Sequence, residues 1–308
     1  MGISRRCRSV IVGTDWWTDS DDVVAMRVLV WAEQQGMVKI AAVGMSACMP
    51  YSAASLDAFL TAEGRPGVRI GIDIEATDFG KVPKYQKNMA ERLNGAKRNE
   101  DCEDAVRMYR RTLAEMPNKL DLIEIGYQQV LAALLQSPGD DLSPLTGLEL
   151  VTLKVNKLWV MAGHWENDGS GVENNFARNR RSIVAGHHVC AHWPTPITFL
   201  GWEVSNKILT GGTLPEDDNV ALALRDHGFP NGRSSWDPML VLLACLGDEE
   251  EAGYRTVVGT AHVDVDSGRN SFDVHADGKH AYVVKVHPDE VYREAIDRIL
   301  ESCVRSDL

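Results

Sequence analysis

Long apolar runs are missing from this sequence. No stretch approaches the roughly 18 apolar residues of a membrane-spanning helix, and the run Val10–Val12 is far too short for a signal-peptide core. We therefore expect a cytoplasmic protein with no membrane partner. Basic residues are in the minority, with 32 Lys and Arg against 44 Asp and Glu and a net charge of −12. An acidic chain without a basic stripe argues against a nucleic-acid partner.

Several common site motifs are absent as well. The sequence has neither a glycine-rich phosphate loop nor a G-x-S-x-G nucleophile elbow, which argues against phosphoryl transfer and serine hydrolysis. Its cysteines show no C-x-x-C spacing, so we predict reduced thiols that mostly serve packing rather than a zinc site or a disulfide framework. These cysteines are Cys7, Cys48, Cys102, Cys190, Cys245 and Cys303.

What is present has the composition of a globular protein. Of 308 residues, 44% are hydrophobic and 25% charged. No internal repeat or linker divides the chain, so we predict a single domain over residues 1–308. In the first half, β-branched runs alternate with helical patterns, an order that predicts right-handed crossovers onto a mainly parallel sheet. The expected strands are Ser9–Thr14, Val38–Met45 and Val68–Ile74, with helices from Asp21 and over Ser55–Ala62.

The second half continues this pattern after one interruption. The polar segment Glu75–Asp104 predicts a mobile loop or lid that borders a site. Strands are then expected at Leu120–Ile125, Lys157–Met161 and Ile197–Leu200, and the alternating stretch Arg255–Val286 predicts an antiparallel hairpin. The sequence thus predicts an α/β fold, with an open, mainly parallel (Rossmann-like) sheet flanked by helices and an antiparallel hairpin near the C-terminus.

The most informative segment is a cluster of acids between the first strand and the first helix. Asp15, Asp19, Asp21 and Asp22 lie within eight residues. A solvated loop with a helix cap accounts for one or two of these acids, whereas four like charges so close together repel one another. Hard cations such as Ca²⁺ are bound by several such oxygens, although the spacing is not that of an EF-hand. We therefore expect a metal site completed by residues from elsewhere in the chain.

Six segments in order resemble the inosine-uridine-preferring nucleoside hydrolases. VIVGTD followed by DSDDVVAM is similar to the D-T-D-P-G-x-D-D-A-x-A-[LIM] signature of that family. VKIAAVGM with SLDAFLTAEGRPGVRIGI resembles its second strand, helix and third strand. LIEIGYQQVLAALLQSP resembles L-G-P-L-T-N-x-A-x-A-L. LWVMAG resembles its M-G-G strand end, Glu173–Phe176 its E-F-N segment and Trp236-Asp237-Pro238 its H-D-P.

The resemblance implies a Ca²⁺-dependent enzyme that hydrolyses the N-glycosidic bond of a ribonucleoside, as a homodimer or homotetramer. Asp22 matches a bidentate metal ligand, Asp237 a ligand that also contacts the ribose, and Gln129 a residue that offers its backbone carbonyl. The matches to sugar-binding positions are Asp21, Asn167, Glu173 and Asn175.

The first motif can be aligned in two ways. With two residues inserted before Asp21, Asp15 takes the position of the catalytic base and metal ligand, at the carboxyl end of the first strand. Without a gap, Trp17 replaces the base. We favour the gapped version. Asp19 is then an extra ligand, an alternative base or a loop acid, and Trp16 and Trp17 either stack on a base or pack in the core.

The second departure is Trp236, where the family often has a histidine that protonates the leaving base. An indole can stack and donate one hydrogen bond, but it is not a general acid. His164 is our first candidate for that role, and His227, Arg233 and Tyr85 are weaker ones. Because of these replacements, two alternatives stay open beside the hydrolase: a ribose-binding or nucleoside-binding protein that has lost turnover, and a hydrolase of modified nucleosides.

Overall fold

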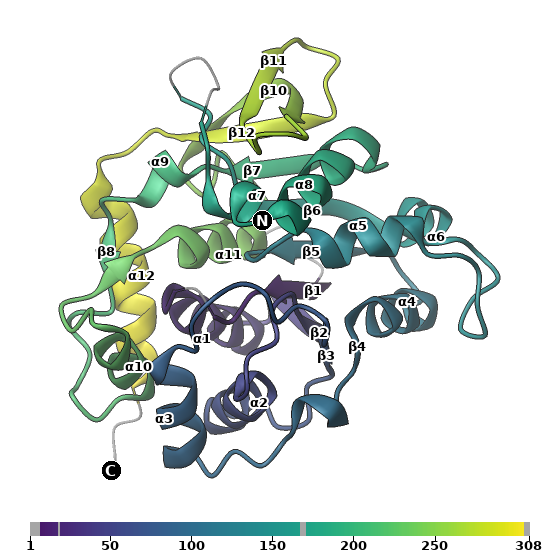
Figure 1. Cartoon of the computed structure of the whole chain (residues 1–308). Coiled ribbons are helices and arrows are strands. Elements are labelled where there is room, and N and C mark those ends of the chain that lie inside the picture. Colours follow the sequence, from purple (N-terminus) through teal and green to yellow (C-terminus); the bar gives the residue numbers. More distant parts are fainter. Residues whose placement is uncertain (1–6, 18, 167–170, 305–308) are drawn as a thin grey trace.

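The strands build one large mixed sheet at the centre of the molecule (Figure 1). The structure is a computed structural model that describes residues 7–17, 19–166 and 171–304. Within these residues the sheet has ten strands in the order β11-β10-β12-β7-β6-β5-β1-β2-β3-β4. Their bounds are β1 Arg8–Thr14, β2 Val38–Met45, β3 Ile70–Ile72, β4 Glu103–Asp104, β5 Leu120–Glu124, β6 Val155–Met161, β7 Ile197–Leu200, β10 Tyr254–Val263, β11 Asn270–Val274 and β12 His280–Lys285.

Strand direction divides this sheet into two parts. From β12 through β7 to β4, each strand is parallel to the next one in the sheet, whereas β10 is antiparallel to both β11 and β12. The predicted mainly parallel sheet with antiparallel strands near the C-terminus is confirmed. A separate pair, β8 (Leu209–Thr210) and β9 (Arg233–Ser234), is antiparallel.

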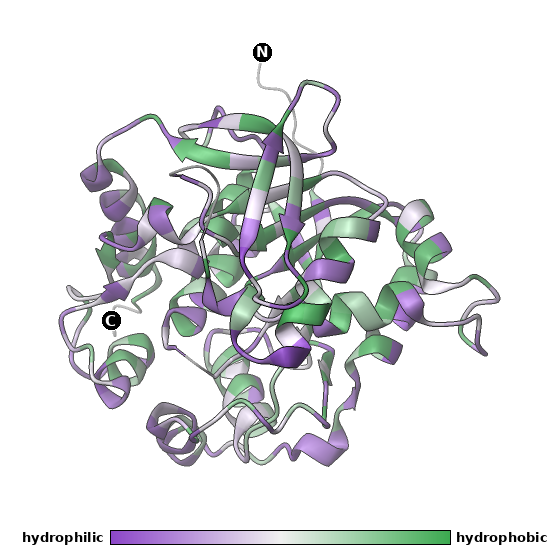
Figure 2. Ribbon diagram, turned by 45° about the horizontal axis from the view of Figure 1, so that its top comes forward, coloured by the Kyte–Doolittle hydropathy of each residue, from purple (hydrophilic) through white to green (hydrophobic). Residues whose placement is uncertain are grey.

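Helices cover both faces of the sheet because the central strands are apolar on both sides. In β1, Val10 and Val12 join one core cluster and Ile11 joins the other, as the two-residue period of a strand requires. The first face carries α1 (Asp21–Gln34), α2 (Ser52–Ala62), α11 (Trp236–Leu246) and α12 (Asp289–Cys303). The second carries α4 (Ala105–Glu115), α5 (Gln129–Gln136), α6 (Gly147–Lys154) and α8 (Arg180–His192). In Figure 2 the helices carry both green and purple stretches, as expected of elements with one buried and one solvent-facing side.

Shorter helices occupy the crossovers. They are α3 (Lys84–Arg92), the 3-10 turn η1 (Asn99–Asp101), α7 (Asn174–Ala177), α9 (Trp202–Ser205) and α10 (Asn219–His227). The prediction of a loop throughout residues 75–104 is wrong, because α3, η1 and β4 lie within it. Tyr85 and Met89 are four residues apart and both buried, so they form the apolar face of α3. The polar residues around this pair give the segment the composition of a loop. No helix in the described part of the chain is long and apolar enough to cross a membrane.

Candidate functional site

A cavity of about 260 Å³ opens where the parallel strands end. Its wall includes Asp15 just after β1, Ile125 just after β5 and Met161 at the end of β6. The carboxyl ends of neighbouring parallel strands are where open α/β sheets place their ligands. The strand order therefore places the acidic segment after β1 at the expected edge of the sheet.

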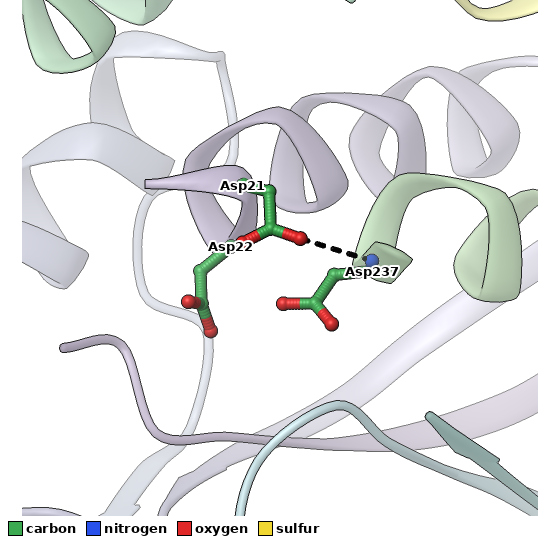
Figure 3. Close-up of side chains that lie close together, drawn as sticks. All are labelled: Asp21, Asp22 and Asp237. Atoms are coloured by element: carbon green, nitrogen blue, oxygen red, sulfur yellow. Dashed lines mark hydrogen bonds between the residues drawn. The ribbon is translucent and has the colours of Figure 1, made fainter. Parts of the chain in front are cut away.

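Three carboxylates from two helix starts meet in this cavity (Figure 3). Asp21 and Asp22 open α1, Asp237 lies in the first turn of α11, and an oxygen from each lies within 4.8 Å of the others. The backbone N–H of Asp237 donates to Asp21 Oδ2 at 3.1 Å. Both helices point their positive ends at the cluster, which partly offsets the repulsion between the acids.

Burial and repulsion act together on these acids. Burial raises the pKa of the Asp22 carboxyl well above its usual value, and repulsion from Asp15 and Asp21 raises this pKa further. Hydrogen bonds from the Thr14 hydroxyl and from the backbone N–H of Trp16, at 3.2 Å, oppose this shift. Burial followed by neighbouring acids raises the pKa values of Asp21 and Asp237 as well. Buried carboxylate oxygens of this kind fit a hard divalent cation such as Ca²⁺.

The turn after β1 separates the side chains of Asp15, Trp16 and Trp17. Asp15 lines the cavity, and its Oδ1 accepts a hydrogen bond from the backbone N–H of Trp17 at 3.0 Å. Trp16 has the unusual φ of 47° for a residue other than glycine, and its fully buried indole donates to Ser55 Oγ at 2.9 Å. The Trp17 indole packs away from the acids, in a cluster with Phe79. The structure thus places Asp15, and not Trp17, beside Asp21 and Asp22.

Asp19 lines the cavity and forms an ion pair with the side chain of Arg233. Arg233 of β9 donates to both of its oxygens, with Nε at 2.7 Å from Oδ1 and 2.9 Å from Oδ2. The guanidinium lies over the rings of Phe229, at 4.2 Å, and Trp236, at 4.8 Å. His227 Nε2 lies 3.8 Å from Asp19 Oδ1. Asp19 therefore has a charge partner outside the Asp21–Asp22–Asp237 cluster.

The opposite wall carries Glu173 and Asn175 at the start of α7. Glu173 accepts hydrogen bonds from the backbone N–H groups of Asn175, at 2.9 Å, and Gly163, at 3.0 Å. Burial raises the pKa of Glu173 to about 7, although these backbone hydrogen bonds act against the rise. The Asn175 amide donates to the Met161 carbonyl at 2.9 Å. Both side chains are thereby fixed in orientation at the cavity wall.

Comparison with known proteins identifies the architecture. No protein-family model and no curated protein sequence matches the chain. The effector protein XOO4466 superposes with a TM-score of 0.68 at 15% sequence identity, covering 97% of this chain and 94% of its own. The inosine-uridine preferring nucleoside hydrolase from Bacillus anthracis gives a TM-score of 0.63 at 14% identity, covering 95% and 98%. This is a nucleoside hydrolase-like fold.

A third solved structure with the nucleoside hydrolase-like fold contains a ligand. The type III effector XopQ, in complex with adenosine diphosphate ribose, superposes with a TM-score of 0.67 at 17% identity over 97% of this chain and 95% of its own. The likeness establishes the shared architecture. This is also the fold that the resemblance of the sequence motifs implies.

Three predicted site residues, Trp17, Gln129 and His164, are not among the described residues that line the cavity, and a fourth is not described. The Gln129 side chain donates to the Ser46 carbonyl. The His164 ring packs against Trp202, which lines the cavity, and its Nε2 lies 3.9 Å from Glu203. Asn167 lies outside the described residues.

Trp202 lines the cavity although the sequence did not predict it there, and Arg233, which the sequence offers only as a weaker candidate, lines it as well. Trp202 follows the end of β7 by two residues, at the same sheet edge as Asp15. That position was a usable signal once β7 had been predicted. Arg233 comes from a two-residue strand that no periodicity reveals, so only the tertiary structure brings it to Asp19 and Trp236.

Proposed function

We propose that this protein hydrolyses the N-glycosidic bond of a ribonucleoside or a modified nucleoside and depends on Ca²⁺ for this activity. The observation that carries the proposal is the convergence of Asp21, Asp22 and Asp237 from two helix starts in a cavity at the carboxyl edge of a nucleoside hydrolase-like sheet. A buried triad of carboxylates is unfavourable without a cation, and this cavity has room for a small ligand beside it.

Asp15, Asp22 and Asp237 would hold the cation, together with the backbone carbonyl of Gln129. When bound, a divalent cation supplies positive charge that lowers the pKa of an adjacent water molecule. Asp15 accepts a proton from the water that attacks C1′ of the ribose. The C1′–N bond then breaks, and its electron pair leaves with the base.

The sugar is held by polar groups at the deep end of the cavity. Asp21, Glu173 and Asn175 grip the ribose hydroxyls, and Asn167 is proposed to add a further contact. Fixed carboxylate and amide groups stabilise the oxocarbenium-like transition state of glycosyl cleavage without having to reorganise. Trp236 offers ring surface to the base, because its indole N–H already donates to the Trp202 carbonyl at 3.0 Å.

The test is ribose release from a panel of purine, pyrimidine and modified ribonucleosides, with Ca²⁺ and with a chelator. We expect Ca²⁺-dependent release that Asp22→Ala abolishes. Asp57→Ala is the matched control, because Asp57 pairs with Lys97 at 2.9 Å on α2 and is not among the described residues of the cavity wall. Release that is unchanged in Asp22→Ala would contradict the proposed site.

The second candidate is a protein that binds a ribose-containing ligand without turnover. It is favoured by Trp236, which stands where a proton donor is expected and whose N–H is already engaged. The structural neighbour XopQ was solved with adenosine diphosphate ribose. Calorimetric binding of nucleosides or of adenosine diphosphate ribose, with no ribose released from any member of the panel, would support this candidate over the hydrolase.

A further inference from the structure

The two ends of the cavity differ in chemistry. Asp15, Asp21, Asp22 and Asp237 are each at most 5% exposed and form the deep end. Trp202 is 41% exposed, and the side chains of Arg233 and Asp19 are about one-fifth exposed, which places these groups toward the mouth. On the proposed function, the sugar occupies the deep acidic end. The leaving base therefore lies beside Trp202, Trp236 and Arg233.

Arg233 is held in place on two sides. Asp19 binds its Nε and Nη2, and the flat guanidinium is stacked on the rings of Phe229 and Trp236. No described residue accepts a hydrogen bond from Nη1. A guanidinium that is fixed in this way keeps its charge and loses little conformational freedom when a ligand arrives.

The chemistry of cleavage requires such a group near the base. When water attacks C1′ and the C1′–N bond breaks, a neutral heterocyclic base takes up the bonding electron pair and becomes negatively charged. Trp236 supplies no proton, and its N–H is bound to the Trp202 carbonyl. Among the described residues of the cavity wall, Arg233 is the single cationic side chain.

We propose that Arg233 contacts the leaving base and stabilises the negative charge that the base takes up as the C1′–N bond breaks. This inference rests on the proposed hydrolase function and deepens it. A fixed positive charge close to a developing negative charge acts most strongly in a partly buried site. The arginine remains protonated throughout, and the base takes its proton from solvent after departure. The expected substrates are ribosides of neutral, nitrogen-linked heterocycles whose anions are delocalised, such as oxopurines and oxopyrimidines.

The experiment compares two leaving groups. Inosine and uridine release a base that leaves with negative charge, whereas nicotinamide riboside carries a cationic base that leaves as a neutral molecule. For Arg233→Gln we expect kcat on the better of inosine and uridine to fall about 100-fold, the usual effect of losing one transition-state donor. On nicotinamide riboside we expect a change of less than about threefold, because no anion forms there to be stabilised. Arg233→Lys keeps the positive charge but lacks the planar guanidinium. Its kcat on inosine or uridine should therefore fall less than that of Arg233→Gln.

The control is Arg92→Gln, which removes an arginine that pairs with Asp226 at 2.8 Å between α3 and α10. It should leave both substrates unaffected. Equal losses on both substrates in Arg233→Gln and Arg233→Lys would show that Arg233 serves only to hold Asp19 and Trp236, and would overturn the inference. The same holds if the native protein cleaves nicotinamide riboside but neither neutral nucleoside. If it cleaves none of the three with Ca²⁺, the proposed hydrolase function itself fails on these substrates.

Discussion

At the scale of single residues, this site brings together groups that reduce the stability of the fold. Asp21, Asp22 and Asp237 are each at most 5% exposed and lie within reach of one another, and burial raises all three pKa values. Trp16 adds a backbone in the left-handed region directly before the cluster. Unfavourable charge and strained backbone concentrated at one place are typical of functional sites, where the surrounding fold enforces them.

The first prediction concerns the change Asp22→Asn. Without a divalent cation, removing one of three crowded carboxylates relieves repulsion, so the variant should melt at a higher temperature than the native protein in chelator. With Ca²⁺ the order should reverse, because only the native site gains binding energy from the cation. Scanning calorimetry at neutral pH with chelator and with millimolar Ca²⁺ measures both effects. Asp57→Asn should show neither of them. A Ca²⁺-induced stabilisation that survives in Asp22→Asn would exclude this carboxylate as a ligand.

At the scale of elements, the site depends on the close approach of two turns. The turns after β1 and β5 meet so tightly that a Cβ on Gly126 would lie 2.3 Å from the backbone nitrogen of Asp15 and 2.7 Å from Ser46 Oγ. Beneath them, burial raises the pKa of Glu124 to about 8, and this carboxyl accepts the backbone N–H of Gly126 at 3.0 Å. Adjacent parallel strands therefore fix the position of Asp15 through backbone contacts.

The change Gly126→Ala tests this arrangement. A methyl group that meets backbone cannot be accommodated by side-chain rotation, so we expect a loss of about 2 kcal/mol in unfolding free energy. Activity should fall together with stability, because Asp15 must move. The matched variant is Gly36→Ala at the end of α1, where φ is +73° and a Cβ would meet no atom within 4 Å. That change should cost about 1 kcal/mol of backbone strain and leave kcat intact. Denaturant titration and ribose release separate the two; native activity in Gly126→Ala would refute the argument.

The helices and strands also differ in how well the sequence alone predicts them. The apolar period of β1 and the acids that follow it were enough to predict a strand that ends at an acidic site, and the structure has this strand and this cluster. The sequence did not predict α3, because most of its residues are polar and its buried face has few apolar side chains. It also gave no hint of the contact between Arg233 and Asp19, 214 residues apart, because long-range side-chain pairing has no local signal.

For the whole molecule, net charge is less informative than its distribution. Of the described residues that line the cavity, six are among the 44 acidic residues of the sequence and one, Arg233, is basic. At the far edge of the sheet, β12 pairs in parallel with β7 and so joins the antiparallel strands β10 and β11 to the parallel core. The predicted homodimer or homotetramer stays a prediction, to be measured by light scattering.

The unfolding free energy should depend on pH through His280, which lies where β12 pairs with β7 and β10. The imidazole lies at the start of β12, is 6% exposed, and its Nδ1 accepts the backbone N–H of Ala261 at 3.0 Å. Burial, with smaller contributions from His262 and Lys279, lowers its pKa to about 4, so the folded protein keeps the ring neutral. The unfolded chain binds a proton near pH 6.5 and the folded chain near pH 4. The contribution is therefore complete above pH 6.5 and is lost as pH falls through the interval between these values.

Because of His280, we expect the unfolding free energy of the native protein to fall by about 2 kcal/mol when the pH is lowered from 7 to 5. Denaturant titration at both pH values, in chelator to exclude metal effects, gives the native change, and His280→Asn should flatten it. His275→Asn is the control, because His275 is exposed and its ring Nε2 forms a surface hydrogen bond with Thr260 Oγ1 at 2.8 Å. The same pH dependence in His280→Asn as in the native protein would show that another group controls acid stability.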